Sequence, residues 1–455
     1  MKKIYLDWNV INHLEENAEL HRFILQNLSH FVFVYSPAHF SDLMRSYNEG
    51  ENNAYFEKDL ERLEAVCETH LMRYYDKKLN IHRCSPREFL EKEGKNYPFF
   101  KDFLNPNFYK EFMKIDGLDF YGFFSESLKS ISFGKTIELP LFGGFSNAFE
   151  LFGRSLEFIE KIMTDKEFVK AIRTGATKDV EDKEITCISD YNPTEVMGVI
   201  NAFFKRYGAD FDLEELINKV IIDEQKGNKM LLFESIYAGL DLMRYHSDKR
   251  NFANILADSD HAFYGSFCDV LVTDDTRMRY KTEAVYSYFG FNTKIISKHE
   301  LMDYLINELA NENNLEAPIK ELFSDQHIPQ EYEEGSVYIK WVRLDCPYYS
   351  FFNKLEYRLP LSSRQSYFVF TRELGFEKYV YYTEIDKLFE IIKCELHDFD
   401  AIQAFEEQYV EKYYANDKTA EYALYFSQII LVLGVLENQG HLMPIMYMLM
   451  EEQAE

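Results

Sequence analysis

Four short segments rich in β-branched and aromatic residues end abruptly at polar residues. Runs of this length and composition predict buried strands, and they cover Lys3–Leu6, Phe31–Tyr35, Val270–Thr273 and Lys294–Ile296. Helical patterns separate these runs. Because strands that alternate with helices usually form a parallel sheet, we expect an α/β domain whose mainly parallel sheet is flanked by helices.

Two helix starts have a clear local signal. Ser36 before Pro37 has the composition of an N-cap followed by proline at the first helical position. Asn192 before Pro193 repeats the pattern, and Gly208 is expected to end that second helix.

The spacing of these elements predicts an α/β domain in two halves, separated by a long insertion. In order along the chain, the expected parts are 1–75 and 226–308 for the α/β domain, 76–225 for a helical, aromatic-rich insertion, 309–335 for a polar linker and 336–455 for an α+β region. In the last region, Ser336–Arg343 and Ser366–Thr371 are predicted strands, and helices are expected from there to the C-terminus.

Composition and charge narrow the classes of protein. The chain has 455 residues, of which 46% are hydrophobic and 28% charged, so it can form a core. A net charge of −27 argues against a nucleic-acid coat protein or a polybasic membrane binder, although one local groove could still hold RNA or DNA. The six cysteines form no CxxC pair, and the longest apolar run near the C-terminus falls short of a membrane span. We expect a cytoplasmic protein without a membrane anchor.

The negative charge is concentrated in the last third of the chain. Residues 311–455 carry 12 basic and 26 acidic residues, a net charge of −14. This region is a poor nucleic-acid arm, and it is either a surface for a protein partner or a plain solvated surface.

Carboxylates follow three of the predicted strands or strand-to-helix turns. Asp7 follows the first strand, Asp42 lies on the first turns of the helix after the second, and Asp274 and Asp275 follow the third. In open α/β sheets, ligands bind outside the carboxyl ends of the strands. Acids gathered there repel one another unless cations neutralise them, and Mg²⁺ prefers oxygen ligands.

A further acid precedes the third strand, at Asp258 or Asp260. In a helix these two positions point about 200° apart, so only one of them can face such a site. Asp258 is preferred because it shares a face with His261, and Asp260 is the alternative. His39 and Asp42 are also three residues apart and can share a helix face.

These residues, in this order, resemble the PIN-domain nucleases. The matching positions are Asp7 with Asn9, Asp42, Asp258 or Asp260, and Thr273 with Asp275, and the segments SPAHFSD and DSDHAFYGSFCDVLVTDD resemble a subgroup with a histidine three residues from each acid. The resemblance covers only the two halves of the α/β domain. It departs from the family in the 215 residues between Asp42 and Asp258, and in having Asp at position 42 where Glu is common.

The resemblance implies a metal-dependent endoribonuclease that uses Mg²⁺ or Mn²⁺ and leaves a 3′-hydroxyl and a 5′-phosphate, with a toxin or defence role compatible. The expected catalytic residues are Asp7, Asp42, Asp258 and Asp275, and the wider set of expected metal ligands is Asp7, Asp42, Asp258, Asp260, Asp274 and Asp275. A non-catalytic PIN-like scaffold and a structure-selective DNA nuclease are the alternatives.

Supporting roles are expected for neighbouring polar and basic residues. Asn9, His39, His261 and Thr273 could orient the acids or bound water, although structural histidines are commoner than functional ones. Arg277, Arg279 and Lys281 could hold phosphates, and a solvated helix face explains them equally well. The acidic surface predicts weak activity of the isolated chain, with a structured RNA or a protein partner supplying specificity.

Overall fold

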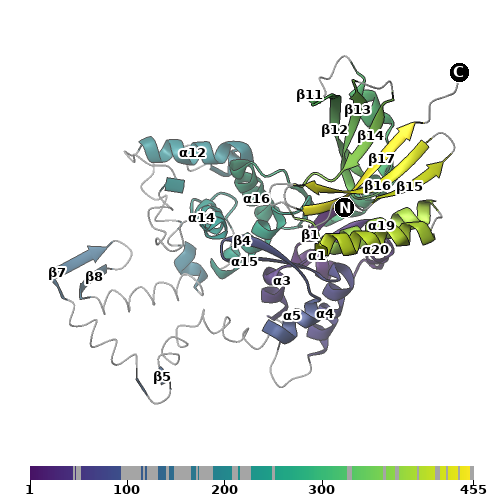
Figure 1. Ribbon diagram of the computed structural model, residues 1–455. Helices are drawn as coiled ribbons and strands as arrows, with labels where there is room; N and C mark the ends of the chain where they lie inside the picture. The colour runs from purple at the N-terminus through teal and green to yellow at the C-terminus, as the bar shows by residue number, and fades with distance from the viewer. Residues whose placement is uncertain are drawn as a thin grey trace.

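The chain folds into two units that meet near its N-terminus, an α/β unit and a C-terminal unit built on a large antiparallel sheet (Figure 1). The structure is a computed structural model that describes residues 1–44, 47, 53–93, 114–115, 118–119, 132–139, 143–147, 165–170, 173, 188–206, 214–215, 227–247, 252–324, 330–361, 365–374, 379–396, 399–415, 421–426, 429–438 and 441–450.

The α/β unit contains a four-stranded parallel sheet in the order β10-β9-β1-β2. Its strands are β1 (Lys2–Leu6), β2 (Phe31–Val34), β9 (Val270–Val272) and β10 (Lys294–Ile296). All four were predicted from their apolar runs to within a residue at either end. Since every strand runs in the same direction, their carboxyl ends lie along one edge of the sheet.

Helices cover both faces of this sheet, so its strands are buried on both sides. Ile4 and Leu6 of β1 pack into one hydrophobic core with residues of the first five helices, whereas Tyr5 between them packs into a second core with residues of the later ones. The helices of this unit are α1 (Trp8–His13), α2 (Ala18–Gln26), α3 (Pro37–Leu43), α4 (Ala54–Cys67), α5 (Pro86–Glu93), α12 (Pro193–Arg206), α14 (Lys229–Leu242), α15 (Phe252–Gly265), α16 (Thr276–Phe289) and α17 (Lys298–Asn311). The two predicted helix starts are confirmed, because α3 follows the Ser36 cap and α12 begins at Pro193.

A two-stranded antiparallel ribbon continues the sheet beyond β2. It consists of β3 (His70–Tyr75) and β4 (Lys78–Arg83), and a parallel bridge joins Tyr35 to Leu71.

The region predicted as a helical insertion, 76–225, lies largely outside the described residues. Its described parts include strands as well as helices: besides β4, α5 and α12 they are β5 (Lys114–Ile115), β6 (Leu118–Asp119), β7 (Ser132–Leu139), β8 (Gly143–Asn147) and the 3₁₀ helix η3 (Ile188–Asp190). The expected helix end at Gly208 also lies outside the described residues.

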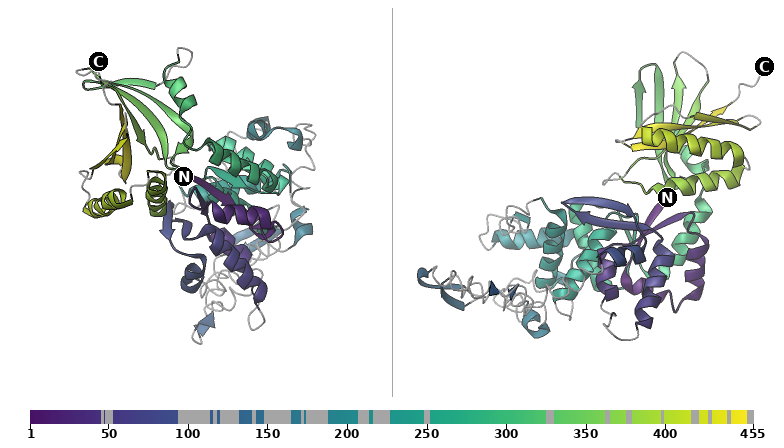
Figure 2. Two further views of the ribbon diagram at one scale, coloured as in Figure 1. Left: turned by 90° about the vertical axis from the view of Figure 1, so that its right-hand side faces the viewer. Right: turned by 60° about the horizontal axis from the view of Figure 1, so that its bottom comes forward.

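The C-terminal unit is a seven-stranded antiparallel sheet in the order β11-β12-β13-β14-β17-β16-β15, and it curves beside the helices α19 and α20 (Figure 2). Its strands are β11 (Gln330–Glu334), β12 (Val337–Tyr348), β13 (Phe352–Pro360), β14 (Tyr367–Thr371), β15 (Glu421–Phe426), β16 (Ile429–Asn438) and β17 (His441–Met450), and its helices are α18 (Glu316–Leu322), α19 (Tyr382–Leu396) and α20 (Phe399–Ala415).

Two predictions about this part of the chain were wrong. The segment predicted as a polar linker, 309–335, contains α18 and β11, and Leu322 of α18 is fully buried. The region expected to be helical to the C-terminus ends in three strands after α20. Both errors have the same cause, since long-range pairing and packing overrode the local composition.

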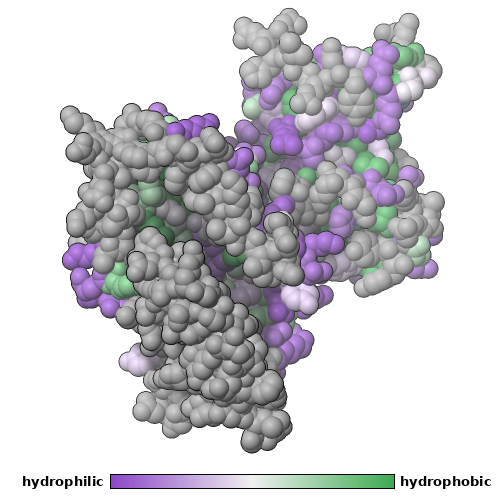
Figure 3. All heavy atoms as spheres, turned by 90° about the vertical axis from the view of Figure 1, so that its left-hand side faces the viewer, coloured by the Kyte–Doolittle hydropathy of each residue, from purple (hydrophilic) through white to green (hydrophobic). Residues whose placement is uncertain are grey.

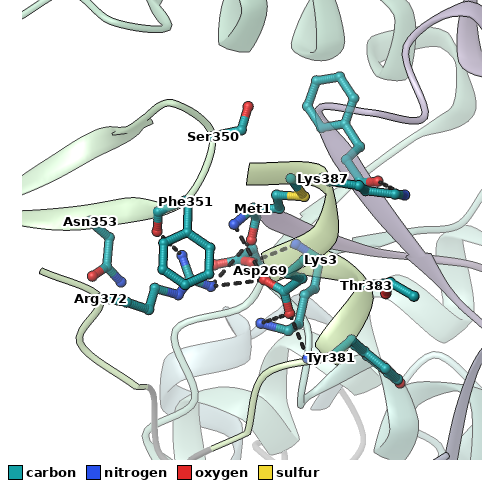
Figure 4. A network of polar contacts seen from close by, with 12 residues as sticks. Met1, Lys3, Asp269, Ser350, Phe351, Asn353, Arg372, Tyr381, Thr383 and Lys387 are labelled. Carbon is teal, nitrogen blue, oxygen red and sulfur yellow. Dashed lines mark hydrogen bonds and ion pairs between the residues drawn. The ribbon is translucent and has the colours of Figure 1, made fainter. Parts of the chain in front are cut away.

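A buried ion cluster joins the two units (Figure 4). Glu384 at the start of α19 has no exposed surface and lies 3.2 Å from Lys3 Nζ of β1, 3.5 Å from Arg372 and 3.3 Å from the Met1 amine. Arg372, which follows β14, also donates to the Phe351 carbonyl at 3.0 Å and to the Met1 carbonyl at 3.3 Å, so it links the C-terminal sheet to the N-terminus of the α/β unit.

The described surface on one side of the molecule is mainly hydrophilic where the two units adjoin (Figure 3). Within the described residues, no helix combines the length and apolar character needed to cross a bilayer.

Candidate active site at the carboxyl edge of the parallel sheet

Asp7 directly follows β1 and is held at the sheet edge by its neighbours. Its backbone N–H donates to the Val272 carbonyl at 2.9 Å, which extends the pairing of β1 with β9 by one residue. The carboxylate oxygen Oδ2 accepts from Thr273 Oγ1 at 3.0 Å and from Asn9 Nδ2 at 3.4 Å. Asp7 is only 4% exposed. Because β1 and β9 are parallel neighbours, the residues after each strand meet as the sequence predicted.

Asp275 lies at the same edge of the sheet, in the short turn between β9 and α16. Its backbone N–H donates to Thr273 Oγ1 at 3.2 Å, and its side-chain Oδ1 caps α16 by accepting from the N–H groups of Arg277 and Met278 at 2.9 and 3.0 Å. Thr273 therefore contacts both Asp7 and Asp275. The structure brings these three predicted residues together, with Asn9 beside them.

Asp42 of α3 pairs with a histidine from α15. Its Oδ2 lies 2.8 Å from His261 Nε2, although 219 positions separate the two residues in the chain. The other ring nitrogen of His261 lies 3.0 Å from the Tyr5 hydroxyl, which lies 2.7 Å from Ser36 Oγ. Burial lowers the pKa of His261, but the hydrogen bond to Asp42 and the charges of Asp42, Asp7 and Asp260 outweigh burial, so the pKa is raised overall.

His39 has a different environment from His261. Its Nδ1 accepts from the Ser36 N–H at 3.1 Å, completing a capping box for α3, and its Nε2 donates to the Leu6 carbonyl at 2.8 Å. Burial, followed by the charge of His261, lowers the pKa of His39 to about 3. His39 is thus neutral at physiological pH and ties α3 to the end of β1.

The environment of Asp7 disfavours its negative charge. Burial raises the pKa of Asp7 and the nearby Asp42 adds to the rise, against the opposing effects of His261, Thr273 and Asn9. A divalent cation bound at this edge would relieve the repulsion between Asp7 and Asp42.

Asp258 and Asp260 both lie on α15 but have different neighbours. Asp258 is among the charges that raise the pKa of Tyr237, together with Asp275, Asp241 and Asp7. Asp260 forms a hydrogen bond with Glu234, and burial, followed by that glutamate, raises its pKa well above the ordinary value. Asp258 therefore acts on Tyr237 together with Asp7 and Asp275, whereas Asp260 lies beside Glu234 and interacts with His261 and Asp42.

Helix α14 contributes three polar residues that sequence reasoning missed. Glu234, Tyr237 and Asp241 are spaced three and four apart, so they share one face of a helix that is otherwise largely apolar. That spacing was a readable signal. Tyr237 is fully buried, its ring lies 4.8 Å from Lys281 Nζ, and its hydroxyl has no hydrogen-bond partner among the described residues. Apart from burial, the four carboxylates Asp258, Asp275, Asp241 and Asp7 are the groups that raise its pKa.

Asp274 and Lys281 do not join the candidate site in the expected roles. Asp274 accepts from the backbone N–H of Lys298 at 3.0 Å and pairs with its Nζ at 2.7 Å, so it is directed toward α17. Consecutive side chains leaving a strand end point in different directions, and only Asp275 joins Asp7. Lys281 has no exposed surface and pairs with the buried Asp241 at 2.9 Å, which also pairs with Arg173. A fully buried lysine cannot meet a phosphate.

The two arginines of α16 differ in their partners. Arg279 pairs with Glu283 at 2.9 Å and lies 3.9 Å from Glu300, an arrangement typical of a solvated helix face. Arg277 follows the Asp275 cap and is half-buried, so it is the basic residue of this helix that remains a candidate for contact with phosphate.

In the described part of the chain, no three His, Cys, Asp or Glu side chains converge tightly enough to hold a metal ion. Comparison of the chain with protein-family models, with curated proteins and with solved structures gives no match.

Proposed function

We propose that this protein is a metal-dependent, PIN-like endoribonuclease whose active centre is the carboxyl edge of the β10-β9-β1-β2 sheet. The observation that carries the proposal is the contact of Thr273 with both Asp7 and Asp275 at that edge, beside the Asp42–His261 pair. Acids from three distant chain segments gather where open α/β sheets bind their ligands.

The donor set fits Mg²⁺ or Mn²⁺, because it consists of carboxylate oxygens and includes a buried Asp7 whose charge is disfavoured by Asp42. Because no three of these side chains converge on one point in the described structure, Asp7, Asp258 and Asp275 would hold the ion mainly through bound water, with Asp42 as the fourth acid. A bound divalent ion supplies two things, a lower pKa for attacking water and neutralisation of charge on the phosphate.

The protein's own groups orient the reactants. Thr273 and Asn9 fix the carboxylate of Asp7 by donating to its Oδ2, and His261 fixes Asp42. Arg277 can contact the phosphate at the rim, whereas the Tyr237 hydroxyl is fully buried, has no partner among the described residues and can donate only to an enclosed water or to a neighbouring acid. In this proposal water attacks phosphorus without a side-chain nucleophile, leaving a 3′-hydroxyl and a 5′-phosphate. The net charge of −27 supports weak capture of unstructured RNA by the chain alone.

The test compares cleavage of labelled RNA and DNA pools by the wild type and by Asp7→Asn and Asp275→Asn, each with Mg²⁺, Mn²⁺ or EDTA. Asparagine is itself a good N-cap, so Asp275→Asn should keep α16 folded. Asp274→Asn is the matched control, since it changes the adjacent acid that pairs with Lys298.

We expect metal-dependent RNA cleavage by the wild type and by Asp274→Asn, and loss of cleavage in the other two variants. Preferential cleavage of DNA would favour the DNA nuclease instead. If no wild-type reaction cleaves RNA and Asp7-dependent Mn²⁺ binding is also missing, the nuclease assignment fails and the scaffold alternative is favoured.

A further inference from the structure

A cavity of about 270 Å³ lies where the two units meet, well separated in the chain from the acids of the candidate active site. Its walls come from three places: the β3–β4 ribbon of the α/β unit, the start of α19 and the start of β17 in the C-terminal unit. Both units must therefore be docked for the cavity to exist.

The polar side chains that line this cavity are basic or neutral. Arg83 and His82 come from the end of β4, and His441 comes from the first position of β17. The hydroxyl residues Thr69 and Thr383 add further donors, and Thr383 Oγ1 lies 2.8 Å from His70 Nε2. The described lining contains no carboxylate, although the chain as a whole has 77 acidic residues against 50 basic ones. Arg83 brings a formal positive charge to a described lining without carboxylates, and in an acidic protein this favours an anionic ligand.

The start of α19 forms one wall but adds nothing to this preference. Glu384 in its first turn already accepts from the Tyr381 N–H at 3.0 Å, so the preference for an anion rests on Arg83. One acid competes for Arg83, because the charge of Arg83 opposes the rise that burial causes in the pKa of Asp386. Asp386 lies one turn into α19 and is not part of the lining.

The remaining walls are apolar and aromatic. Ile81, Val380, Ile385 and Leu442 line the cavity together with the rings of Tyr381 and Tyr382. A small inorganic anion would leave this apolar surface in contact with water, whereas an aromatic heterocycle would cover it. The volume suits one nucleotide better than an oligonucleotide.

We propose that the cavity binds a nucleoside monophosphate, with the phosphate beside Arg83 and the base against the apolar and tyrosine walls. The same chemistry is present in a free mononucleotide and in the 5′-phosphorylated end of an RNA chain. Since both units supply walls, the ligand binds the docked form and stabilises the junction that also contains the Glu384 ion cluster. This inference does not depend on the proposed nuclease activity.

The experiment measures binding of adenosine 5′-monophosphate to the full chain by calorimetry and by thermal shift. Adenosine, inorganic phosphate, and short RNAs with a 5′-phosphate or a 5′-hydroxyl serve as comparison ligands. We expect the monophosphate to bind and to raise the Tm, and adenosine and phosphate alone to bind at least about tenfold more weakly. Tighter binding of the 5′-phosphorylated RNA than of the free nucleotide would assign the site to RNA ends; the reverse would assign it to free nucleotide.

Four variants make the test specific. Arg83→Gln should weaken binding about tenfold or more, since a charge-assisted contact is lost, and Asp386→Asn should strengthen it because the competing acid is removed. Arg87→Gln is the matched control, because this arginine pairs with Glu57 and Glu64 outside the lining and should leave binding unchanged. Asp7→Asn should also leave binding unchanged.

The proposal is overturned if the wild type does not bind the monophosphate, or if Arg83→Gln binds it as the wild type does. Equal affinity for adenosine would refute the role of the phosphate, and equal affinity for inorganic phosphate would refute the role of the base. Loss of binding in Asp7→Asn would place the nucleotide at the acidic sheet edge instead.

Discussion

Replacing Glu384 with glutamine should weaken the junction between the two units by a predictable amount. Burial raises the pKa of this carboxyl, but Lys3, the Met1 amine and Arg372 outweigh burial and lower the pKa from 4.5 to about 2. Since one pKa unit corresponds to about 1.4 kcal/mol, this lowering amounts to about 3 kcal/mol of stability from the ionised carboxylate at neutral pH. Removing one partner of a buried ion pair typically has a similar effect, about 3–5 kcal/mol.

The sign of the pH dependence follows from the direction of the shift. A carboxyl with a lowered pKa in the folded protein contributes its stability above the unfolded value of 4.5 and loses it as the pH falls through about 2. The difference in the free energy of unfolding between the wild type and Glu384→Gln should therefore be largest at pH 7 and shrink steadily below pH 5.

The assay is urea unfolding followed by fluorescence, because the chain has 2 tryptophans and each unit contains one of them. Trp8 lies in α1 of the α/β unit and Trp341 in β12 of the C-terminal unit, so replacing either with phenylalanine leaves a reporter for the other. Glu390→Gln on the same helix is the matched control. Its side chain is 64% exposed and pairs with Lys393, so its loss should change the free energy of unfolding by less than about 1 kcal/mol.

The role of Glu384 at the junction would be refuted if Glu384→Gln lowers the free energy of unfolding by less than about 1 kcal/mol. It would also be refuted if that loss is the same at pH 7 and at pH 3. The double variant Lys3→Met, Glu384→Gln separates charge from packing. Because removing the carboxylate leaves buried cations without a counter-charge, the double variant should lose less stability than the sum of the two single variants.

Three other predictions concern the candidate site and its surroundings. Tyr237→Phe should change stability little, because its hydroxyl has no partner in the described structure, and should slow RNA cleavage about tenfold, because it removes a buried donor close to the acids; an unchanged rate would contradict this. Mn²⁺ should raise the Tm more at pH 8 than at pH 5.5, because the raised pKa of Asp7 makes protons compete with the ion. Without metal, the free energy of unfolding should fall as the pH rises through the raised pKa values of Asp7 and His261. If Mn²⁺ raises the Tm of Asp7→Asn as much as that of the wild type, the role of Asp7 is refuted. Asp241→Asn should lower the free energy of unfolding by about 3 kcal/mol, because it leaves the buried Lys281 and Arg173 without their carboxylate; a loss no larger than that of Asp274→Asn in the same urea titration would contradict it.

The sequence predicted the parallel sheet because its strands carry local information. The apolar runs of β1, β2, β9 and β10 are short, rich in β-branched and aromatic residues and bounded by polar ones. The Ser36 cap of α3 was also readable locally, since a cap depends on a few adjacent residues. Once the strands were taken as parallel, the meeting of Asp7, Thr273 and Asp275 followed, because one edge collects all the carboxyl ends.

The C-terminal sheet could not be predicted in the same way. The run of β17, HLMPIMYMLM, has no clear alternation and is rich in residues that also favour helices. Pairing with β14 and β16 decided its conformation, together with burial of residues such as Met443 and Met446 against the helices.

Local patterns in the sequence identify the strands of the parallel sheet, and the helices between them indicate its direction. The residues that follow those strands could therefore be named before the structure was known. The tertiary structure decided the partners of those residues. It paired His261 with Asp42, turned Asp274 toward Lys298, buried Lys281 against Asp241 and buried Tyr237 close enough to four acids for their charges to raise its pKa. The physical reason is that such contacts depend on how helices from distant parts of the chain pack against the sheet, and packing is decided by the whole core.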